Sequence, residues 1–325
     1  MTYGILYIKQ GGINLKKAVI FGIGSSLFFS LTFILNRQMN IDGGSWLWSS
    51  SLRYIFMLPI LFIIMILNNQ LKVVIRDILK RPIQWIIWST VGFGLFYAPL
   101  SFASEYGASW LVAGTWQITI VAGALMSPLF MEKVKVGECT VYVRNSIPKK
   151  SLMMSSIILL GIFLMMFEEA KDISGSKTFL VIIPVIIAAF AYPLGNRKMM
   201  EICKNEFTTF QRVFGMTLCS MPFWLFISIW GTITVGLPSK GQVVQSFIVA
   251  IFSGVIATIL FFKATEMVSN NVHKLAIIES TQAGEVIFTL LGGIFILNDK
   301  IPTTIGIVGI GLVVIGMILN SVIKS

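Results

Sequence analysis

Ten apolar segments, separated by short polar stretches, divide this chain of 325 residues. A helix that crosses a hydrocarbon core of about 30 Å needs roughly 20 mostly apolar residues, because each residue adds about 1.5 Å. The ten segments are Ala18–Leu35, Trp46–Leu67, Ile86–Ala103, Trp110–Met131, Leu152–Phe167, Thr178–Leu194, Phe207–Val235, Val243–Phe262, Leu275–Leu297 and Ile301–Ile323. They lack the alternation of apolar and polar residues that a barrel wall needs. The pattern predicts an all-α membrane protein with ten transmembrane helices.

Composition agrees with this prediction. Only 12% of the residues are charged and 56% are hydrophobic, whereas a soluble domain carries about 25% charged residues. Too few charges remain to cover a surface that faces water. We expect two short polar stretches, 68–83 and 132–151, to be loops rather than a second domain.

The net charge of +11 does not indicate a nucleic-acid-binding face, because the basic residues lie in short clusters between apolar segments. If the N-terminus is cytoplasmic, 17 Lys and Arg residues fall in cytoplasmic segments, 5 in outer segments and 3 within the spans. This bias is the positive-inside signature. It predicts a multi-pass protein of the plasma membrane with both termini in the cytoplasm, and no nucleic-acid partner.

Short polar words recur in the same order in the two halves of the chain, at offsets of about 160 residues. The pairs are Asn36-Arg37-x-Met39 with Asn196-Arg197-x-Met199, Arg53-x-x-x-Met57 with Arg212-x-x-x-Met216, Ala103-Ser104-Glu105 with Ala264-Thr265-Glu266, Thr115-Trp116-Gln117 with Ser280-Thr281-Gln282, and Ile147-Pro148 with Ile301-Pro302. Five matches in one order predict an internal duplication into five-helix halves, 1–167 and 168–325. An odd number of spans per half inverts the second half, an architecture typical of secondary transporters.

We expect the two Asn–Arg words to end their helices, because a cation there complements the negative end of the helix dipole. A role in gating is the alternative. Four glycines in the last segment, Gly306, Gly309, Gly311 and Gly316, predict close helix packing within the fold or, alternatively, a homodimer contact.

The five-plus-five repeat, the matched Asn–Arg words and the tail FILNDKIPTTIGIVGIGLVVIGMIL (295–319) carry a family resemblance. The chain resembles the drug/metabolite transporter superfamily, in its EamA-like branch, and within it the multidrug-resistance efflux transporters. The tail is similar to that family's closing pattern of an apolar helix, a short charged turn and a Gly-rich last helix. The resemblance implies a ten-helix transporter, with efflux favoured over uptake.

The ninth segment carries a polar stripe. Glu285 lies about 15 Å into this segment, near the midplane of a bilayer. Glu279 and Gln282 share its side of the helix, within roughly 120° of arc. We expect the stripe to face the interior, where Glu285 with Glu279 binds the coupling proton or a cationic group of the substrate. Alternatively, Glu285 is a structural carboxylate paired with Arg53 or Arg212.

Two arginines occupy matched positions, Arg53 in the second segment and Arg212 in the seventh. One hypothesis makes them contacts for an anion or carboxylate along the pathway. The alternative is that they lie near helix N-termini and snorkel or pair with acids. The fourth segment adds Trp116, an aromatic surface, and Gln117, an amide, as candidate substrate contacts.

Prolines next to tyrosines interrupt two of the predicted helices. Tyr97 precedes Pro99 in the third segment, and Tyr192 precedes Pro193 in the sixth. A proline inside a helix frees a carbonyl and permits a kink. Such kinks either line a substrate cavity or only bend the helix, and we count both tyrosines among the candidate contacts.

The sequence therefore predicts a secondary active transporter that exports a small organic solute or drug by alternating access, with proton coupling as an option. A permease for metabolites such as amino acids or nucleosides, and a membrane receptor or scaffold that does not transport, are the alternatives. A membrane enzyme is disfavoured, because the chain has one histidine and no H-E-x-x-H motif. No G-x-x-x-x-G-K-[ST] loop is present, and no cofactor or metal is expected.

Overall fold

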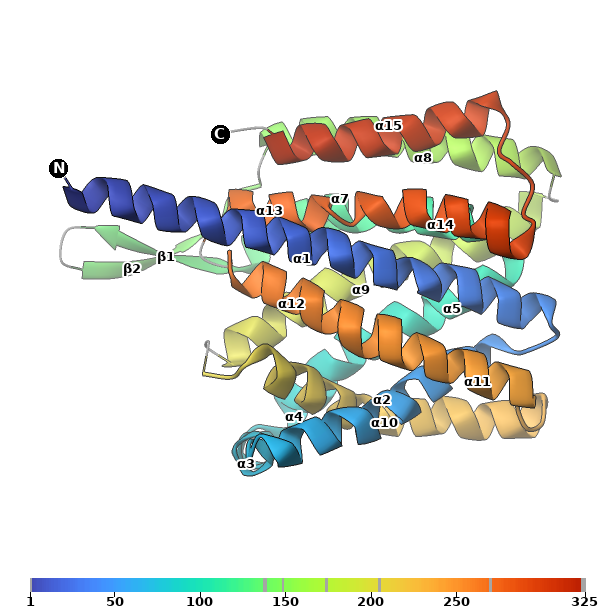
Figure 1. The fold of residues 1–325 in the computed structure, drawn as a ribbon, viewed down its shortest axis with the longest axis horizontal. Helices are drawn as coiled ribbons and strands as arrows, with labels where there is room; N and C mark the ends of the chain where they lie inside the picture. The colour runs from blue at the N-terminus through green and yellow to red at the C-terminus, as the bar shows by residue number, and fades with distance from the viewer. Residues whose placement is uncertain are drawn as a thin grey trace.

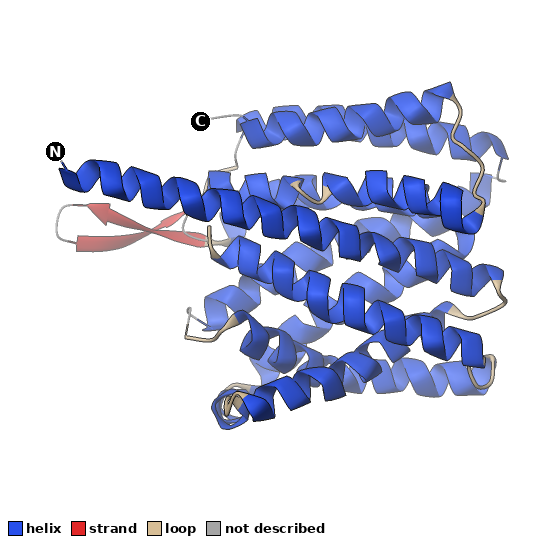
Figure 2. Cartoon of the chain, viewed as in Figure 1, coloured by secondary structure: helices blue, strands red, loops and turns tan. Residues whose placement is uncertain are grey.

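The computed structural model describes residues 2–136, 139–147, 149–172, 175–203, 206–268 and 271–322. Helices dominate these ranges, with one small β-hairpin (Figure 2). The elements are α1 (Thr2–Ile41), α2 (Trp46–Leu67), α3 (Leu71–Lys80), α4 (Pro82–Ser89), η1 (Thr90–Gly94), α5 (Leu95–Tyr106), α6 (Ser109–Trp116), α7 (Ile118–Leu125), η2 (Ser127–Leu129), β1 (Met131–Val136), β2 (Cys139–Arg144), α8 (Lys149–Asp172), α9 (Gly175–Cys203), α10 (Thr209–Thr234), α11 (Lys240–Val249), η3 (Ala250–Ala257), α12 (Thr258–Glu266), α13 (Val272–Ser280), α14 (Ala283–Leu297) and α15 (Thr304–Val322).

Apolar helices among the described residues lie at the predicted apolar segments, and some segments hold more than one helical element. Seven described helices are long and apolar enough to cross a membrane, namely Leu15–Ile41, Trp46–Leu67, Pro82–Tyr106, Phe179–Cys203, Thr209–Thr234, Lys240–Glu266 and Ile277–Leu297. Three shorter apolar helices, Ser109–Leu125, Leu152–Glu168 and Thr304–Leu319, lie at the fourth, fifth and tenth predicted segments. The prediction of a helical membrane protein is confirmed.

Many large apolar side chains lie on the surface of the bundle. Large side chains such as Ile233 and Phe295 are more than three-quarters exposed. Water would not tolerate so continuous an apolar surface, whereas lipid tails would. Aromatic residues such as Trp85, Tyr97 and Trp224 fill the interior.

Figure 1 shows the arrangement of the bundle. Helix α1 crosses the front of this view between α12 and α14, both of which it contacts. Helices α8 and α15 pack as a pair along one edge, and α2 packs against α10 at the opposite edge. The chain ends lie at one end of the bundle, where the hairpin projects. Central helices from both halves are thereby positioned to enclose a site.

Glycines let the helices of the edge pair approach closely, as the sequence predicted. A Cβ at Gly309 would collide with the carbonyl of Gly161, and one at Gly316 would meet Ile158. A Cβ at Gly311 would meet no described atom within 4 Å. Close packing of α15 within the fold is therefore confirmed for Gly309 and Gly316. The homodimer contact stays a prediction.

Interruptions occur at matched places in the two halves. A π-helical segment begins at Thr90 in the third span and another at Ala250 in the eighth, 160 residues later. The fourth span breaks at Gln117, and the ninth breaks between Ser280 and Ala283. At both breaks, side chains bond the preceding turn: Gln117 donates to the carbonyl of Ala113, and Ser280 donates to that of Ile277. Such bonds compete with regular helical bonding, so the polar words mark where helices are interrupted.

The prediction that the Asn–Arg words end their helices was wrong. Helix α1 continues to Ile41 and α9 continues to Cys203. No glycine or proline follows either word within the helix, so nothing stops helical bonding there. Asn36 is instead buried, and its Nδ2 donates to the Tyr97 hydroxyl at 3.2 Å and to Ser101 Oγ at 3.3 Å.

The predicted loop at 132–151 contains a hairpin. Strand β1 pairs with β2 in antiparallel register, from Met131 opposite Arg144 to Val136 opposite Cys139. Valine and threonine favour extended backbone, and the segment alternates such residues with charged ones. The fourth span is correspondingly shorter than predicted, because α7 ends at Leu125 and proline enters the next turn in η2.

Candidate functional site

Two cavities adjoin one another inside the bundle. The first, which we name the Glu285 chamber, is lined by Phe29, Thr32, Phe33, Arg53, Phe96, Leu100, Trp116, Tyr192, Gln282 and Glu285. The second, the Glu279 chamber, is lined by Trp116, Thr119, Tyr192, Pro193, Asn196, Arg197, Phe261, Glu279 and Gln282. Both are walled mainly by aromatic and aliphatic groups around a few charges, the usual character of a small-molecule site.

Glu285 lies in the first turn of α14, just after the break in the ninth span. It is 1% exposed, and its Oε2 has no hydrogen-bond partner in the described part of the chain. Gln117 and Trp116 are its polar neighbours. The positive end of the helix dipole favours a carboxylate at this place. The break in the helix therefore brings an acid to the wall of the chamber.

Arg53 is the cation of the same chamber. It is 1% exposed, and its Nη1 donates to Thr32 Oγ1 at 3.2 Å. Its guanidinium carbon lies 4.1 Å from the centre of the Tyr97 ring and 5.7 Å from that of Tyr54. The predicted structural pairing of Glu285 with Arg53 or Arg212 is absent, because no ion pair among the described residues joins these groups.

A cluster of rings separates the two chambers. The ring centroid of Phe96 lies 4.6 Å from that of Tyr192 and 5.1 Å from that of Trp116. Tyr192 and Trp116 line both chambers, as does Gln282. Gln282 is held in place because its Nε2 donates to Ser25 Oγ at 3.1 Å. These three residues form the partition between the chambers.

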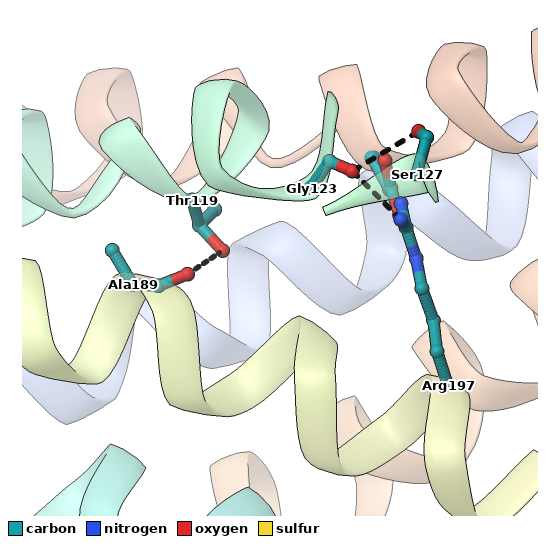
Figure 3. Close-up of polar contacts among 6 residues, drawn as sticks. Thr119, Gly123, Ser127, Ala189 and Arg197 are labelled. Atoms are coloured by element: carbon teal, nitrogen blue, oxygen red, sulfur yellow. Dashed lines mark hydrogen bonds and ion pairs between the residues drawn. The ribbon is translucent and has the colours of Figure 1, made fainter. Parts of the chain in front are cut away.

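Charges are paired in the Glu279 chamber. Arg197 Nη2 lies 2.8 Å from Glu279 Oε1, and Nη1 donates to the carbonyl of Gly123 at 2.7 Å. Figure 3 shows Arg197 reaching from α9 to Gly123 on α7, with Thr119 bonded to the carbonyl of Ala189 nearby. These two contacts of Arg197 connect α9 to the fourth and ninth spans.

The structure brings most of the predicted residues together. Glu285, Gln282, Arg53, Trp116 and Tyr192 line the Glu285 chamber. The remaining predicted residues lie elsewhere: Gln117 is buried beside Glu285, Tyr97 supports the Arg53 guanidinium, Glu279 lies in the second chamber, and Arg212 lines neither chamber as the described residues define them.

Arg212 has surroundings of its own. It is 2% exposed, with its guanidinium carbon 5.1 Å from the centre of the Phe262 ring. Glu266 is its strongest charged neighbour. Nε and Nη2 of Arg212 have no hydrogen-bond partner in the described part of the chain, and no ion pair of Arg212 is found there.

Several lining residues were missed from the sequence. Thr32 precedes Tyr192 by 160 residues, so the repeat offset could have pointed to it. Asn196 and Arg197 were noted as part of a repeated word but interpreted as a helix end. The phenylalanines Phe29, Phe96 and Phe261 carry no signal of their own among the 25 phenylalanines of the chain.

Known proteins are similar to this chain in sequence and in fold. A family model described as "Putative multidrug resistance efflux transporter" (EmrE) matches residues 16–325. The protein YjlA of Bacillus subtilis (strain 168), called uncharacterized, is 52% identical over 305 residues, which are 94% of each chain. A 42.1 kDa protein of Shouchella clausii, from the 3' region of an intracellular alkaline protease, is 49% identical over 269 residues, 83% of this chain and 70% of that one.

A solved structure titled "Crystal structure of protein" has a TM-score of 0.62 at 12% identity, covering 94% of this chain and 96% of the other. At that identity the likeness shows the fold alone. The family match covers nearly the whole chain and describes transporters rather than enzymes. With apolar helices that suit a bilayer, the chain is a multi-pass membrane protein that belongs to the EmrE multidrug resistance efflux transporter family.

Proposed function

We propose that this protein is a secondary active transporter that exports a small organic solute across the plasma membrane by alternating access, coupled to a proton at Glu285. One observation carries the proposal. A carboxylate that is 1% exposed, with one oxygen unpartnered among the described residues, lines a chamber between the helices. Isolated charge is costly in such a place, so a carboxylate there needs a function that repays the cost.

The proposed halves, 1–167 and 168–325, form an inverted repeat of five spans each. Its support is the agreement between the matched words and the matched interruptions, η1 with η3 and the break at Gln117 with the break at Gln282. The chambers are related in the same way. Thr32, Phe33 and Leu100 line the first, and their counterparts at offsets of 160 to 161, Tyr192, Pro193 and Phe261, line the second.

Inverted halves provide a mechanism. Two halves with one fold and opposite orientation can exchange conformations, which opens the pathway first at one end and then at the other. The paired Arg197 and Glu279 close the end at which both termini lie, and the aromatic partition separates the chambers. We place this end, with both termini, in the cytoplasm, because the basic residues cluster there.

Transport into vesicles tests the proposal. The purified protein, reconstituted in proteoliposomes with an imposed pH gradient, is supplied with labelled solutes one at a time. We expect gradient-driven flux that Glu285→Gln abolishes, because the amide cannot exchange a proton. Glu105→Gln, which changes an exposed acid at the end of α5, is the matched control and keeps its flux. Unchanged flux in Glu285→Gln would exclude the assigned role of Glu285.

A further inference from the structure

We infer that the Glu285 chamber binds its solute through an anionic group held by Arg53, so that the substrate class is a small ring-bearing organic acid rather than a cationic drug. The inference rests on the proposed function of the chamber and goes further by naming what it takes. It departs from what the family description suggests, because a buried arginine, Arg53, lines this chamber beside Glu285 and would repel a cation.

The first argument is the state of Arg53. Its Nη1 has one neutral partner, Thr32, and its Nε has none among the described residues. No carboxylate of the described chain lies within 4.0 Å of this guanidinium. A buried charge without a counter-charge is strongly unfavourable, and the contact with the Tyr97 ring recovers only part of that cost. A guanidinium presents a planar fork that fits a carboxylate in bidentate geometry.

The second argument is the contrast with Arg212. Both arginines occupy matched positions, both are buried, and both have an unpartnered Nε among the described atoms. Arg53 lines a chamber, whereas Arg212 lines neither chamber and has Glu266 as a charged neighbour. A purely structural arginine would not need a cavity beside it. Arg53 therefore has a place for an external anion beside it, which Arg212 lacks.

The third argument is the charge within the chamber. The charged groups on its wall are Arg53 from α2 and Glu285 from α14, and the polar groups facing them are Tyr192 from α9, Thr32 from α1 and Gln282 from the break before α14. Adding a cation to this set leaves one uncompensated positive charge in an apolar space. Adding an anion together with a proton on Glu285 leaves none. The chamber therefore favours an acid that is bound as an anion together with a proton, so that its export follows the combined outward gradient of the acid and the proton.

The remaining wall suits a ring. Phe29, Phe33, Phe96 and Trp116 surround the space beside the two charged groups. Aromatic walls offer large apolar contact and edge-to-face geometry for another ring. A phenyl group with a short acidic arm therefore matches both parts of the chamber.

Three probes with one ring and different charges test the inference. They are phenylacetate, an anion; phenylacetamide, which is neutral; and phenethylamine, a cation. Their affinities for the purified protein follow from the concentration dependence of its thermal unfolding, because a bound ligand stabilises the fold by mass action. We expect phenylacetate to bind at least about tenfold more tightly than either analogue, as a charged hydrogen bond would provide.

Variants locate the binding. Arg53→Gln should weaken the binding of phenylacetate about tenfold or more. Arg53→Lys should weaken binding less, because the charge remains although the planar guanidinium is lost. Arg212→Gln is the matched control and should leave the affinity for phenylacetate within about twofold of the native value. Glu285→Gln, which imitates the protonated acid, should keep or strengthen phenylacetate binding, although it abolishes transport. Should Arg53→Gln fail to fold, Arg53→Lys and the three probes on the native protein still decide.

Tighter binding of phenethylamine, or loss of phenylacetate binding in Glu285→Gln, would overturn the inference. So would equal binding of all three probes, or binding of none. These outcomes concern the charge of the solute alone. The transporter proposal stands or falls separately, on gradient-driven flux in vesicles.

Discussion

The two chambers differ in how their charges are satisfied. In the Glu279 chamber, acid and base meet at 2.8 Å and bind one another. In the Glu285 chamber, Arg53 and Glu285 both line the cavity, and no ion pair among the described residues joins them. A pair that satisfies itself holds helices together, whereas charges left apart are free to take a ligand and a proton. We therefore interpret the first arrangement as a closure and the second as a binding site.

The largest expected effect comes from breaking the close packing of α9, the helix that carries Tyr192 of the partition, against η1. Gly195 on α9 lies against Gly92 of η1, and a Cβ there would also approach the carbonyl of Trp88 to 3.0 Å. Backbone atoms cannot yield easily, so Gly195→Ala should lower the free energy of unfolding by about 3 kcal/mol. Gly311→Ala, where a Cβ meets no described atom within 4 Å, is the control and should be neutral within about 0.5 kcal/mol.

Denaturant titration in detergent measures both variants. Equal effects at the two glycines would show that the close contact of α9 with η1 does not contribute to stability.

The next effect compares the two matched asparagines. Asn36 is fully buried and bonded to Tyr97 and Ser101, whereas Asn196 has an unpartnered Oδ1 in the described structure and lines the Glu279 chamber. Asn36→Ala should therefore cost about 2 kcal/mol of stability, and Asn196→Ala about 0.5 kcal/mol or less. Thermal unfolding of the two variants measures the difference. A larger loss at Asn196 would contradict the distinction between a structural and a lining position.

The smallest effect concerns the closing ion pair. The side chains of Arg197 and Glu279 are 15% and 19% exposed, so water screens them little but does reach them. A double-mutant cycle with Arg197→Ala and Glu279→Ala should give a coupling energy of about 1 kcal/mol. The same cycle on Lys198 and Glu201, whose side chains are 25% and 54% exposed, should give less. A coupling near zero for the first pair would argue against its role as a closure.

Much of the fold could be predicted from the sequence, because lipid imposes length and hydrophobicity on every span. The matched words pointed to the right positions but not to their structure. Gln117 and Gln282 mark breaks, which a repeat search can find, whereas Asn36 and Asn196 lie inside continuous helices. The short repeated motifs do not show whether a helix breaks or continues at the polar residue, because that depends on what packs against its side chain.

The candidate site was predicted in part for a similar reason. The polar stripe of the ninth span identified Glu285, Glu279 and Gln282, but the helix breaks within it, so Glu279 and Glu285 face different chambers. The partner of Glu279 is Arg197, 82 residues earlier, and only the crossing of α9 with the ninth span brings them together. Arg53 and Arg212 share one word yet have different neighbours, which no local pattern records.

Membrane sidedness tests the central claim of inverted halves most directly. The native cysteines are first changed to serine at Cys139, Cys203 and Cys219. A single cysteine then replaces either Asp42 or Glu201, both of which are exposed. Intact cells that carry each variant are treated with a thiol reagent that cannot cross the membrane. The two positions follow the matched Asn–Arg words. We predict that the cysteine at position 42 is labelled from outside and the one at position 201 only after the cells are opened. Labelling of both from the same side would contradict the account.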